Sequence, residues 1–341
     1  MMRAFVVSRF GPPEVLKLVE RPSPAPSAGH VAVNVKAIGL NFADVLARLG
    51  VYPSIPDPPF VPGLELAGIV ESVGANVKNV RRGDRVVGFT RQGAYAERVL
   101  LPSDNLMKMP KNMSFIEAAS LGVTYFTAYH GLITLANARR GERILVHAGA
   151  GGVGTAVIQL AKYLRLKVHA TVGANHKIEV ARKQGADQVV NYREEDFAEA
   201  VREHTKGYGV DIVMDSVGGK IFKPGWRLLA PMGRYILFGF AAVTGKRRVN
   251  KIRAIREFAS TPLLFPPSLI SKNVGFFGFN LYFLFHKQEY FRHVGDKLMK
   301  LYQRKVITPV IGATFPFEKA VEAHAYLQSR LSIGKVVLTM D

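Results

Sequence analysis

The sequence predicts a two-domain α/β protein in which a β-barrel-type unit accompanies a doubly wound parallel sheet. Three observations lead to this fold class. Short strand-like runs separated by glycine and proline fill the first part of the chain. Apolar runs then alternate with helical stretches. The chain has 341 residues, and at about 150 residues per domain this length suggests two domains.

The first part of the chain is expected to form the β-barrel-type unit. Strand-like runs begin at Val31, Leu64, Gly83 and Ala94. Many short strands with glycine and proline between them are typical of barrels. The pattern changes at Ser114, where Glu117 three residues later completes a capping box and predicts a helix start.

From Ile144 onward the chain alternates between strand and helix patterns. Apolar runs predict strands over 144–148, 167–172, 188–192, 210–217 and 234–240. Helical periodicity falls between them, over 153–164, 176–185 and 196–205. This alternation predicts a parallel sheet built from βαβ units. Two further helices and a last strand are expected over 287–303, 317–330 and 334–340.

A glycine-rich loop follows the first strand of this second part. Gly149, Gly151 and Gly154 match G-x-G-x-x-G, and the helix pattern starts directly after them. Strand, glycine turn and helix together aim helix N–H groups at a pyrophosphate. The alternative is a tight turn that binds nothing. The surrounding βαβ pattern favours a dinucleotide site.

The next strand indicates which dinucleotide is bound. Proteins that bind NAD usually place Asp or Glu about 20 residues after the glycines, where it meets the ribose 2′-hydroxyl. Here Gly173, Ala174 and Asn175 occupy this region, and Lys177 follows. A lysine attracts a 2′-phosphate. The sequence therefore predicts NADPH, with an ordinary exposed helix lysine as the alternative reading of Lys177.

The composition limits the partners. The formal net charge is +20, from 46 Lys and Arg against 26 Asp and Glu. This balance suits phosphates, acidic membranes or nucleic acid, although a basic solvated surface also explains it. Nucleic acid ranks last because no binding module is recognisable. The chain has no cysteine, which excludes disulfides, thiolate zinc sites and cysteine nucleophiles.

No targeting or membrane segment is evident. The N-terminus has one short apolar run and then Gly-Pro-Pro, unlike a secretory signal. No run reaches about 18 apolar residues, so no membrane span is expected. We therefore expect a cytoplasmic protein.

These motifs resemble, in order and over nearly the whole chain, the medium-chain dehydrogenase/reductase superfamily. The matching stretches are GLNFADVLARLGVYP, PGLELAGIVESVG, GDRV, AGAGGVG, TVGANHK, NYREED, DIVMDSVGG and GRYILFG. They look like the zinc-independent NADPH:quinone oxidoreductases. VDIVMDSVGG, LLAPMGRYILFGFA and the basic segment after them are similar to the branch named for the synaptic-vesicle membrane (vesicle amine transport) protein.

The resemblance implies a fold, domain limits and an assembly. It implies a GroES-like catalytic domain over 1–124, completed by 282–341. It implies a Rossmann NADPH-binding domain over 125–281. By analogy we expect a homodimer joined by sheet strands across a two-fold axis.

The resemblance also implies chemistry without zinc. Zinc-dependent members have Cys, His and Cys where this chain appears to have Asn41, Leu64 and Val123. These three side chains cannot form a tetrahedral zinc site. Without that Lewis acid, hydride delivery to an electron-poor quinone or enone is favoured over alcohol oxidation.

Two residues are the catalytic candidates. In the resembled enzymes the nicotinamide lies in the cleft between the domains, and Asn41 would line it. Its amide can bond both the carboxamide and a substrate carbonyl; a turn asparagine is the alternative. The Tyr52 phenol would donate to a developing oxyanion, or else Tyr52 is a packed loop aromatic. Asp44 is expected to cap a helix.

The resemblance carries over a set of cofactor residues. For the pyrophosphate they are Gly151, Gly152, Val153 and Gly154. For the adenosine end they are Gly173, Lys177 and Tyr192. At the strand ends near the nicotinamide they are Ser216, Phe238, Gly239, Phe277 and Gly278. Lys335 is a further phosphate candidate.

The remaining features have structural readings. His130 and His147 are expected to be packed or surface-exposed rather than to relay protons. Trp226 is expected to pack in a helix. The basic segment 245–258 would lie on an acidic membrane surface or form a solvated excursion. Two hypotheses follow: an NADPH-dependent quinone or enone reductase, or a lipid-binding protein that retains a reductase fold.

Overall fold

In the computed structural model the chain divides into two compact units. The structure describes residues 1–243 and 265–340. Unit 1 consists of 1–126 and 281–340, and unit 2 of 127–243 and 265–280. Unit 1 thus extends to Phe126 rather than to residue 124, and unit 2 ends at Asn280 rather than at 281. The basic segment 245–258 lies outside the described residues.

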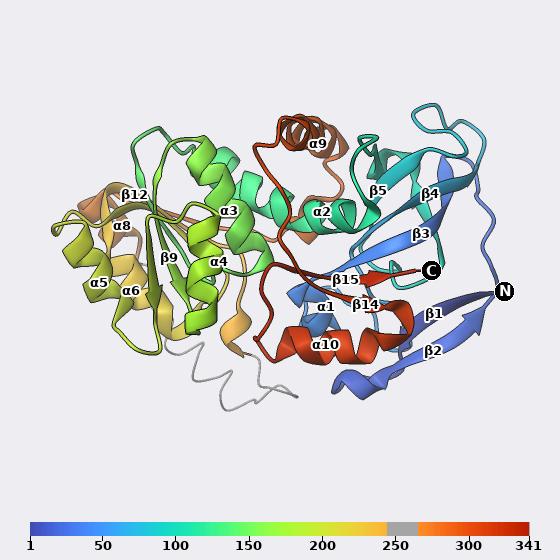
Figure 1. The fold of residues 1–341 in the computed structure, drawn as a ribbon, viewed down its shortest axis with the longest axis horizontal. Coiled ribbons are helices and arrows are strands. Elements are labelled where there is room, and N and C mark those ends of the chain that lie inside the picture. Colours follow the sequence, from blue (N-terminus) through green and yellow to red (C-terminus); the bar gives the residue numbers. More distant parts are fainter. Residues whose placement is uncertain (244–264, 341) are drawn as a thin grey trace. The chain divides into compact units, whose positions relative to one another are not determined.

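Unit 1 is built mainly on antiparallel strands, with β14 and β15 as a parallel pair (Figure 1). A seven-stranded sheet has the order β14-β15-β3-β4-β5-β7, with β6 also paired to β3. A separate two-stranded sheet joins β1 to β2. The strand bounds are β1 Met2–Val7, β2 Leu16–Arg21, β3 His30–Leu40, β4 Glu65–Val73, β5 Arg85–Phe89, β6 Arg98–Pro102, β7 Leu106–Lys108, β14 Ile311–Pro316 and β15 Lys335–Thr339.

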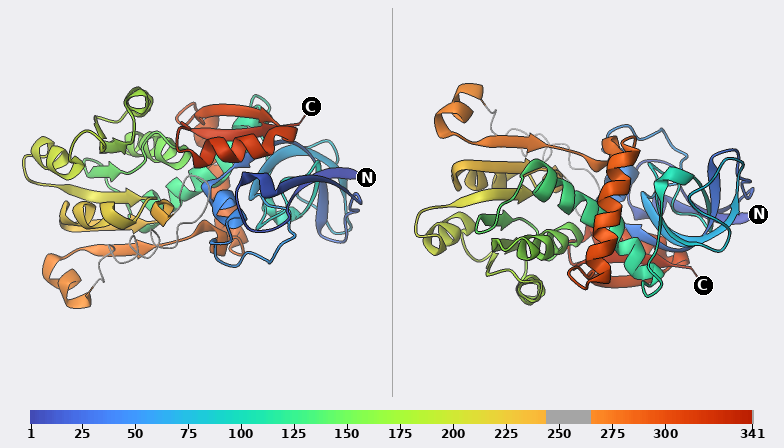
Figure 2. Two further views of the ribbon diagram at one scale, coloured as in Figure 1. Left: turned by 90° about the horizontal axis from the view of Figure 1, so that it is seen from below. Right: turned by 90° about the horizontal axis from the view of Figure 1, so that it is seen from above.

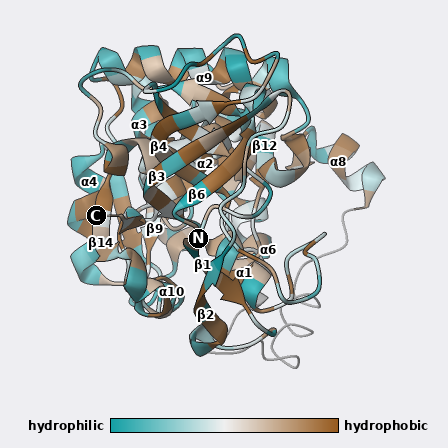
Figure 3. Cartoon of the chain, turned by 90° about the vertical axis from the view of Figure 1, so that its right-hand side faces the viewer, coloured by the Kyte–Doolittle hydropathy of each residue, from teal (hydrophilic) through white to brown (hydrophobic). Residues whose placement is uncertain are grey.

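The helices of unit 1 cover this sheet. Their bounds are α1 Phe42–Arg48, α9 Gln288–Gln303 and α10 Ala320–Gln328, and α2 Phe115–Tyr129 begins in unit 1. Figure 3 shows hydrophobic and hydrophilic residues along α9, whose apolar side includes buried Phe291, Val294 and Leu298. The Ser114 capping box is confirmed, because Glu117 Oε2 accepts from the Ser114 N–H at 2.9 Å. This cap starts α2 where the sequence predicted a helix.

Unit 2 contains a six-stranded parallel sheet in the order β10-β9-β8-β11-β12-β13. Its strands are β8 Arg143–Val146, β9 Lys167–Val172, β10 Gln188–Asn191, β11 Val210–Asp215, β12 Leu229–Leu237 and β13 Gly275–Gly278. The views in Figure 2 show β13 at one edge of the sheet, next to α8. The order reverses direction between β8 and β11, as in a Rossmann dinucleotide-binding fold. The predicted parallel sheet is confirmed.

Helices lie on both faces of this sheet. They are α3 Gly152–Tyr163, α4 Ile178–Lys183, α5 Phe197–His204, α6 Phe222–Arg227 and α8 Pro266–Lys272. Figure 1 shows α3 and α4 on one face and α5 and α6 on the other. The core under α5 and α6 includes Trp226, which packs against both Phe222 and Tyr235. The packing role predicted for Trp226 is confirmed.

Candidate functional site

The glycine loop of unit 2 forms a tight turn between β8 and α3. Ala148 adopts φ +53°, a left-handed conformation that costs energy for a residue with a Cβ. The Gly151 N–H donates to the Ala148 carbonyl at 2.9 Å and closes the turn. A Cβ at Gly154 would lie 2.2 Å from the same carbonyl oxygen. The strand, turn and helix predicted from the motif are therefore all present.

The glycine loop leads directly into the first turn of α3. Gly151 is the N-cap residue with φ −80°, and Gly152, Val153 and Gly154 form the first helical turn. The N–H groups of a first turn have no partners within their helix. Together with the helix dipole they favour an anion such as a pyrophosphate. The geometry of this loop and of the start of α3 fits the pyrophosphate of a dinucleotide.

Two neighbouring loops hold the residues expected at the adenosine end. They follow β9 and β10, and the Asn175 side chain ties them together. Its Oδ1 accepts from Asn191 Nδ2 at 2.7 Å, and its Nδ2 donates to Glu194 Oε1 at 2.7 Å. Gly173 also lies against Tyr192, since a Cβ there would be 2.5 Å from the Tyr192 hydroxyl. The structure thus brings Gly173 and Tyr192 together.

Positive charge gathers at these same loops. Burial, and next the guanidinium of Arg193, lower the pKa of the Lys177 ammonium. The two cations therefore act on each other, and an anion near both would relieve their repulsion. The resemblance pointed to Lys177 but not to Arg193. Arg193 directly follows the cofactor candidate Tyr192 in the sequence, and this adjacency was the signal that could have revealed it.

A third loop follows β11, and the buried carboxylate of Asp215 fixes it by hydrogen bonds. Asp215 is fully buried and accepts from the N–H groups of Val217 at 2.7 Å and Gly218 at 3.0 Å. It also accepts from the Tyr235 hydroxyl at 2.7 Å. Since Ser216 lies inside this loop, Asp215 and Tyr235 position it. Sequence reasoning missed both residues.

The remaining strand-end candidates belong to the next strands of the sheet, β12 and β13. A Cβ at Gly239 would be 2.6 Å from the Ser216 carbonyl oxygen, so the ends of β11 and β12 approach closely. Phe238 stacks on Phe279 with ring centroids 5.8 Å apart. Phe277 and Gly278 lie on β13 opposite Ile236 and Leu237. The carboxyl ends of parallel strands are where this fold type binds ligands.

In unit 1 the Asn41 side chain is held at both ends of its amide. Asn41 lies between β3 and α1 and is 8% exposed. Its Nδ2 donates to the Gly39 carbonyl at 3.1 Å and to Glu65 Oε1 at 2.9 Å. Its Oδ1 accepts from Lys335 Nζ at 2.6 Å. Both amide hydrogens are used, which differs from the expectation that the amide also donates to a substrate carbonyl.

Glu65 and Lys335 form a buried ion pair beneath Asn41. Lys335 Nζ lies 2.5 Å from Glu65 Oε1, and the two side chains are 4% and 0% exposed. Glu65 Oε2 accepts from the Val123 N–H at 2.7 Å. A Cβ at Gly122 would lie only 2.2 Å from that oxygen, so glycine makes room for the carboxylate. The ammonium of Lys335 is committed to this pair, which argues against its expected role as a phosphate partner.

A second buried carboxylate adjoins this pair. Asp44 Oδ2 accepts from the Asn41 N–H at 2.9 Å, which supports the capping role predicted for Asp44. The Tyr95 hydroxyl lies 3.4 Å from the same oxygen and 3.0 Å from His324 Nε2. Burial raises the pKa of Asp44 to about 7, despite the Asn41 hydrogen bond and the Lys335 charge that oppose it. The protonation of Asp44 therefore changes near neutral pH.

Tyr52 lies in the same unit and is partly buried. Its ring contacts Tyr282 edge-on, with centroids 5.6 Å apart and planes at 86°. The Tyr282 hydroxyl donates to the Ser54 carbonyl at 3.3 Å, which fixes the supporting ring. Tyr52 is thus a packed aromatic with a polar end, compatible with both readings of it.

The two histidines set aside in the sequence are both buried in unit 2. His147 Nδ1 lies 2.9 Å from the Thr171 hydroxyl, and its ring packs edge-on against Phe197. His130 packs edge-on against Phe279. Burial lowers the pKa of both imidazoles, so they are neutral at physiological pH. Of the two expected readings, packed or surface-exposed, the structure therefore shows the packed one for both.

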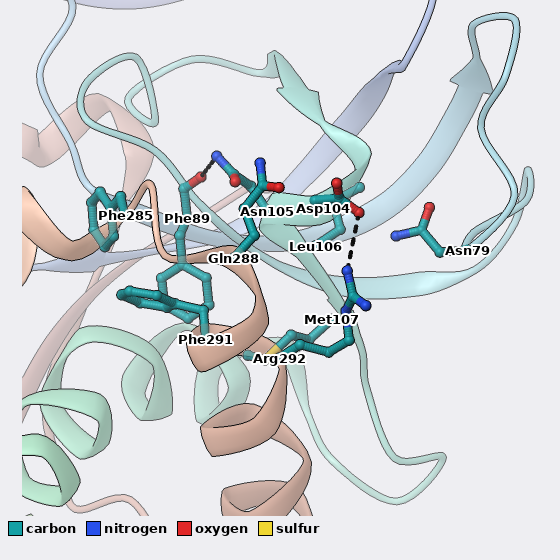
Figure 4. A pocket seen from close by; sticks show the side chains of 10 residues that line it. All are labelled: Asn79, Phe89, Asp104, Asn105, Leu106, Met107, Phe285, Gln288, Phe291 and Arg292. Atoms are coloured by element: carbon teal, nitrogen blue, oxygen red, sulfur yellow. Dashed lines mark hydrogen bonds and ion pairs between the residues drawn. The ribbon is translucent and has the colours of Figure 1, made fainter. Parts of the chain in front are cut away.

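Unit 1 also has a pocket that the sequence did not predict. Figure 4 shows it between α9 and the segment 104–107. Asn105 Nδ2 donates to the Phe89 carbonyl at 3.2 Å. Arg292 Nη2 forms an ion pair with Asp104 Oδ1 at 3.5 Å. None of the labelled side chains that line it is among the sequence-predicted site residues.

The positions that hold zinc in zinc-dependent dehydrogenases do not fit a metal here. The Asn41 amide is fully hydrogen-bonded at its nitrogen, Leu64 is a buried aliphatic residue, and Val123 contributes only its N–H to Glu65. Across residues 1–243 and 265–340 no group of His, Asp or Glu side chains is arranged to hold a metal ion. Within the same residues no helix is long and apolar enough to cross a membrane.

Comparison with known proteins agrees with this architecture. Residues 27–111 match the family model of the alcohol dehydrogenase GroES-like domain, and 184–338 match that of a zinc-binding dehydrogenase. The synaptic vesicle membrane protein VAT-1 homolog of Rattus norvegicus is 38% identical over 99% of this chain and 84% of its own length.

Quinone oxidoreductases are similarly close in sequence and structure. That of Rattus norvegicus is 33% identical, over 100% of this chain and 98% of its own. The structure of the Escherichia coli quinone oxidoreductase complexed with NADPH is 32% identical, covers 99% of both chains and has a TM-score of 0.87.

A GroES-like unit with a Rossmann unit is the architecture of the medium-chain dehydrogenases/reductases. The chain belongs to their quinone oxidoreductase family and is also similar to the VAT-1 homologs.

Proposed function

We propose that this protein is an NADPH-dependent oxidoreductase that passes hydride to a quinone or an α,β-unsaturated carbonyl. One observation carries the proposal: the α3 glycine loop lies in the same unit as Lys177 and Arg193, where an NAD-specific protein would have an acid. Its relatives include a quinone oxidoreductase that was crystallised with NADPH.

The residues of unit 2 would hold the cofactor. Gly151, Gly152, Val153 and Gly154 would receive the pyrophosphate on helix N–H groups. Gly173 and Lys177 would meet the adenosine 2′-phosphate, with Arg193 adding charge, and Tyr192 would stack on or bond to the adenosine end. Ser216, Phe238, Gly239, Phe277 and Gly278 would border the nicotinamide.

Bound NADPH would supply the hydride, and the chain itself would supply orientation and a proton. Tyr52 is the candidate to hydrogen-bond the acceptor oxygen as negative charge develops there, and the proton would come from its phenol or from water. Because the zinc positions hold Asn41, Leu64 and Val123, the acceptor must already be electron-poor. A quinone or an enone meets this requirement, whereas an unactivated alcohol or ketone needs a Lewis acid.

The test is NADPH oxidation against a panel of quinones, enones and saturated ketones. We expect turnover with quinones or enones and none with saturated ketones. Binding of NADPH is followed separately by its fluorescence. A protein that binds no NADPH contradicts the whole proposal, whereas binding with turnover of saturated ketones alone contradicts only the acceptor class.

The alternative is a lipid-binding protein that retains a reductase fold. The name of the VAT-1 homologs, which refers to a synaptic vesicle membrane, and the basic segment 245–258 favour testing it. Acidic liposomes should then bind the protein, less tightly as salt increases. Unchanged binding after Lys246, Arg247 and Arg248 are all replaced by Glu would contradict that mechanism.

We further propose a cytoplasmic homodimer. β13 ends the strand order of the described sheet in unit 2, and Phe277 on it is 37% exposed. A second copy would extend the sheet across a two-fold axis. Sedimentation velocity measures the mass, and a monomer at micromolar concentration would contradict the dimer.

A further inference from the structure

We propose that the pocket between α9 and the segment 104–107 binds a free α-amino acid with an aromatic or other large apolar side chain. The pocket belongs to unit 1 alone, because each residue that lines it lies within 1–126 or 281–340. It contains none of the residues proposed to meet the cofactor or the hydride acceptor. This site is therefore additional to the proposed function and does not depend on it.

The apolar end of the pocket is a preformed cluster of aromatic rings. Phe291 stacks on Phe126 with ring centroids 5.0 Å apart, and Phe89 packs against both, at 6.0 Å and 5.1 Å. Phe285 adds a fourth ring, 5.3 Å from that of Phe291. Phe285 and Met107 are partly exposed, whereas Phe89 is buried. Since the rings already support one another, a ligand can cover the exposed apolar surface without rearranging it.

The polar end of the pocket holds a positive and a negative side chain. Arg292 Nη2 and Asp104 Oδ1 lie 3.5 Å apart, farther than the about 2.7–2.9 Å of a strong charge-assisted hydrogen bond. The two side chains are 63% and 44% exposed. Such a loose, exposed ion pair stabilises a protein little, so a ligand can open it at little cost. Figure 4 shows the aromatic rings on one side of the pocket and this pair on the other.

The two opposite charges together select a zwitterion. A ligand with only a carboxylate would be attracted by the Arg292 guanidinium and repelled by the Asp104 carboxylate. A ligand with only an ammonium would meet the reverse pair of forces. An α-amino acid carries both groups, so its carboxylate pairs with Arg292 while its ammonium pairs with Asp104. One ion pair within the protein is thus exchanged for two with the ligand.

An α-amino acid also matches the division of the pocket into two ends. Its charged groups and its side chain are attached to the same carbon, so a head group at the ion pair leaves the side chain free to reach the aromatic cluster. An aromatic side chain gains from edge-on or offset contact with the partly exposed ring of Phe285. Glycine would gain the contacts of the head group alone. Tight recognition therefore needs both ends of the ligand.

The experiment observes the ligand from inside the pocket. The whole chain is labelled with ¹³C on its methionine methyl groups, and Met107→Leu and Met214→Leu identify two of the signals by their absence. We expect L-phenylalanine to shift the Met107 signal in a saturable way, because Met107 lines the pocket. The signal of Met214, which is buried in unit 2, should stay in place. A Met107 signal that does not move up to the solubility limit of L-phenylalanine would overturn the proposal.

Analogues of the probe test which groups are recognised. Phenylpropionate lacks the ammonium, phenethylamine lacks the carboxylate and glycine lacks the side chain. Each should bind at least about 5-fold more weakly than L-phenylalanine, since each loses a charge-assisted contact or apolar burial. Equal affinity of phenylpropionate, phenethylamine and L-phenylalanine would reduce the site to non-specific apolar binding and overturn the proposal. Equal affinity of the neutral N-acetyl-L-phenylalaninamide would overturn the selection of a zwitterion.

Two variants connect the affinity to the ion pair. Arg292→Gln and Asp104→Asn each remove one charge, and each should weaken L-phenylalanine binding at least about 5-fold. The matched control is Arg81→Gln, because Arg81 is also exposed and pairs with Asp84 of unit 1 at 3.7 Å. This control should leave the affinity unchanged. All three side chains are exposed, so the variants should keep the fold, which circular dichroism checks. Unchanged affinity in both Arg292→Gln and Asp104→Asn would contradict the assigned ligand.

Discussion

The candidate sites of the two units are built from different kinds of groups. In unit 2 the candidate site consists largely of backbone at strand ends, with Lys177 and Tyr192 added from neighbouring loops. In unit 1 it is built on buried side chains, with Asn41 resting on Glu65 and Lys335. A site made of backbone tolerates changes in the side chains around it, but it does not tolerate a Cβ added to one of its glycines. A site of buried charges fails when any one of its members loses its partner.

The largest effect is expected from breaking the buried pair. Lys335→Met leaves the Glu65 carboxylate buried without its cation, which should lower the free energy of unfolding by about 3–5 kcal/mol. Urea titration measures it. The matched control is Lys183→Met, because Lys183 pairs with Glu179 at the surface at 4.0 Å, and it should cost less than about 1 kcal/mol.

A second variant sharpens this comparison. Replacing Glu65 by Leu together with Lys335→Met removes both charges and should recover part of the lost stability. A loss for Lys335→Met as small as for Lys183→Met would show that the pair is not effectively buried.

The next effect is a pH dependence from Asp44. Its pKa rises from 3.8 to about 7 in the folded protein, so the folded state holds its proton more tightly than the unfolded state. Stability from this group is complete below pH 4 and is lost as pH rises to about 7, by at most about 4 kcal/mol. Asp44→Asn keeps an acceptor for the Asn41 N–H but cannot ionise.

The measurement is the difference in unfolding free energy between Asp44→Asn and the wild type. This difference should grow in favour of the variant between pH 4 and 7 and stay constant above. A difference that does not change with pH would mean that Asp44 titrates normally.

The glycine loop gives the third contrast. Gly154→Ala places a Cβ 2.2 Å from the Ala148 oxygen and should destabilise the protein by about 1–3 kcal/mol. Gly151→Ala meets the same oxygen at 3.3 Å and should change stability by less than about 1 kcal/mol. Both should weaken NADPH binding, measured by fluorescence. Unchanged NADPH affinity in both variants would place the pyrophosphate elsewhere.

The smallest effect concerns selectivity. Lys177→Ala should lower the affinity for NADPH relative to NADH by about 10-fold, because it removes a charge-assisted contact to the 2′-phosphate. Lys183→Ala is the control, because the Lys183 side chain on α4 is exposed. Calorimetry measures the dissociation constants of both nucleotides for the two variants. Equal losses for NADPH and NADH would mean that Lys177 does not meet the 2′-phosphate.

The sequence could predict more of the candidate site in unit 2 than in unit 1. The reason is that one site is local in the chain and the other is not. The unit 2 loop is a local motif, because its turn, its glycines and its helix are adjacent in the chain. The carboxylate of Glu65 and the ammonium of Lys335 belong to residues 270 positions apart, and no spacing rule joins them. A signal existed, since each charged residue adjoins an apolar strand run, where an ion is rarely buried without a partner.

The position of β15 has a consequence for how the protein is made. β15 pairs with β3 and with β14, and its first residue supplies the cation for Glu65. A ribosome therefore completes unit 2 while Glu65 still has no counter-ion. Unit 1 can be completed only after the last strand has emerged, so a nascent chain arrested before Lys335 should contain a folded unit 2 and an incompletely folded unit 1.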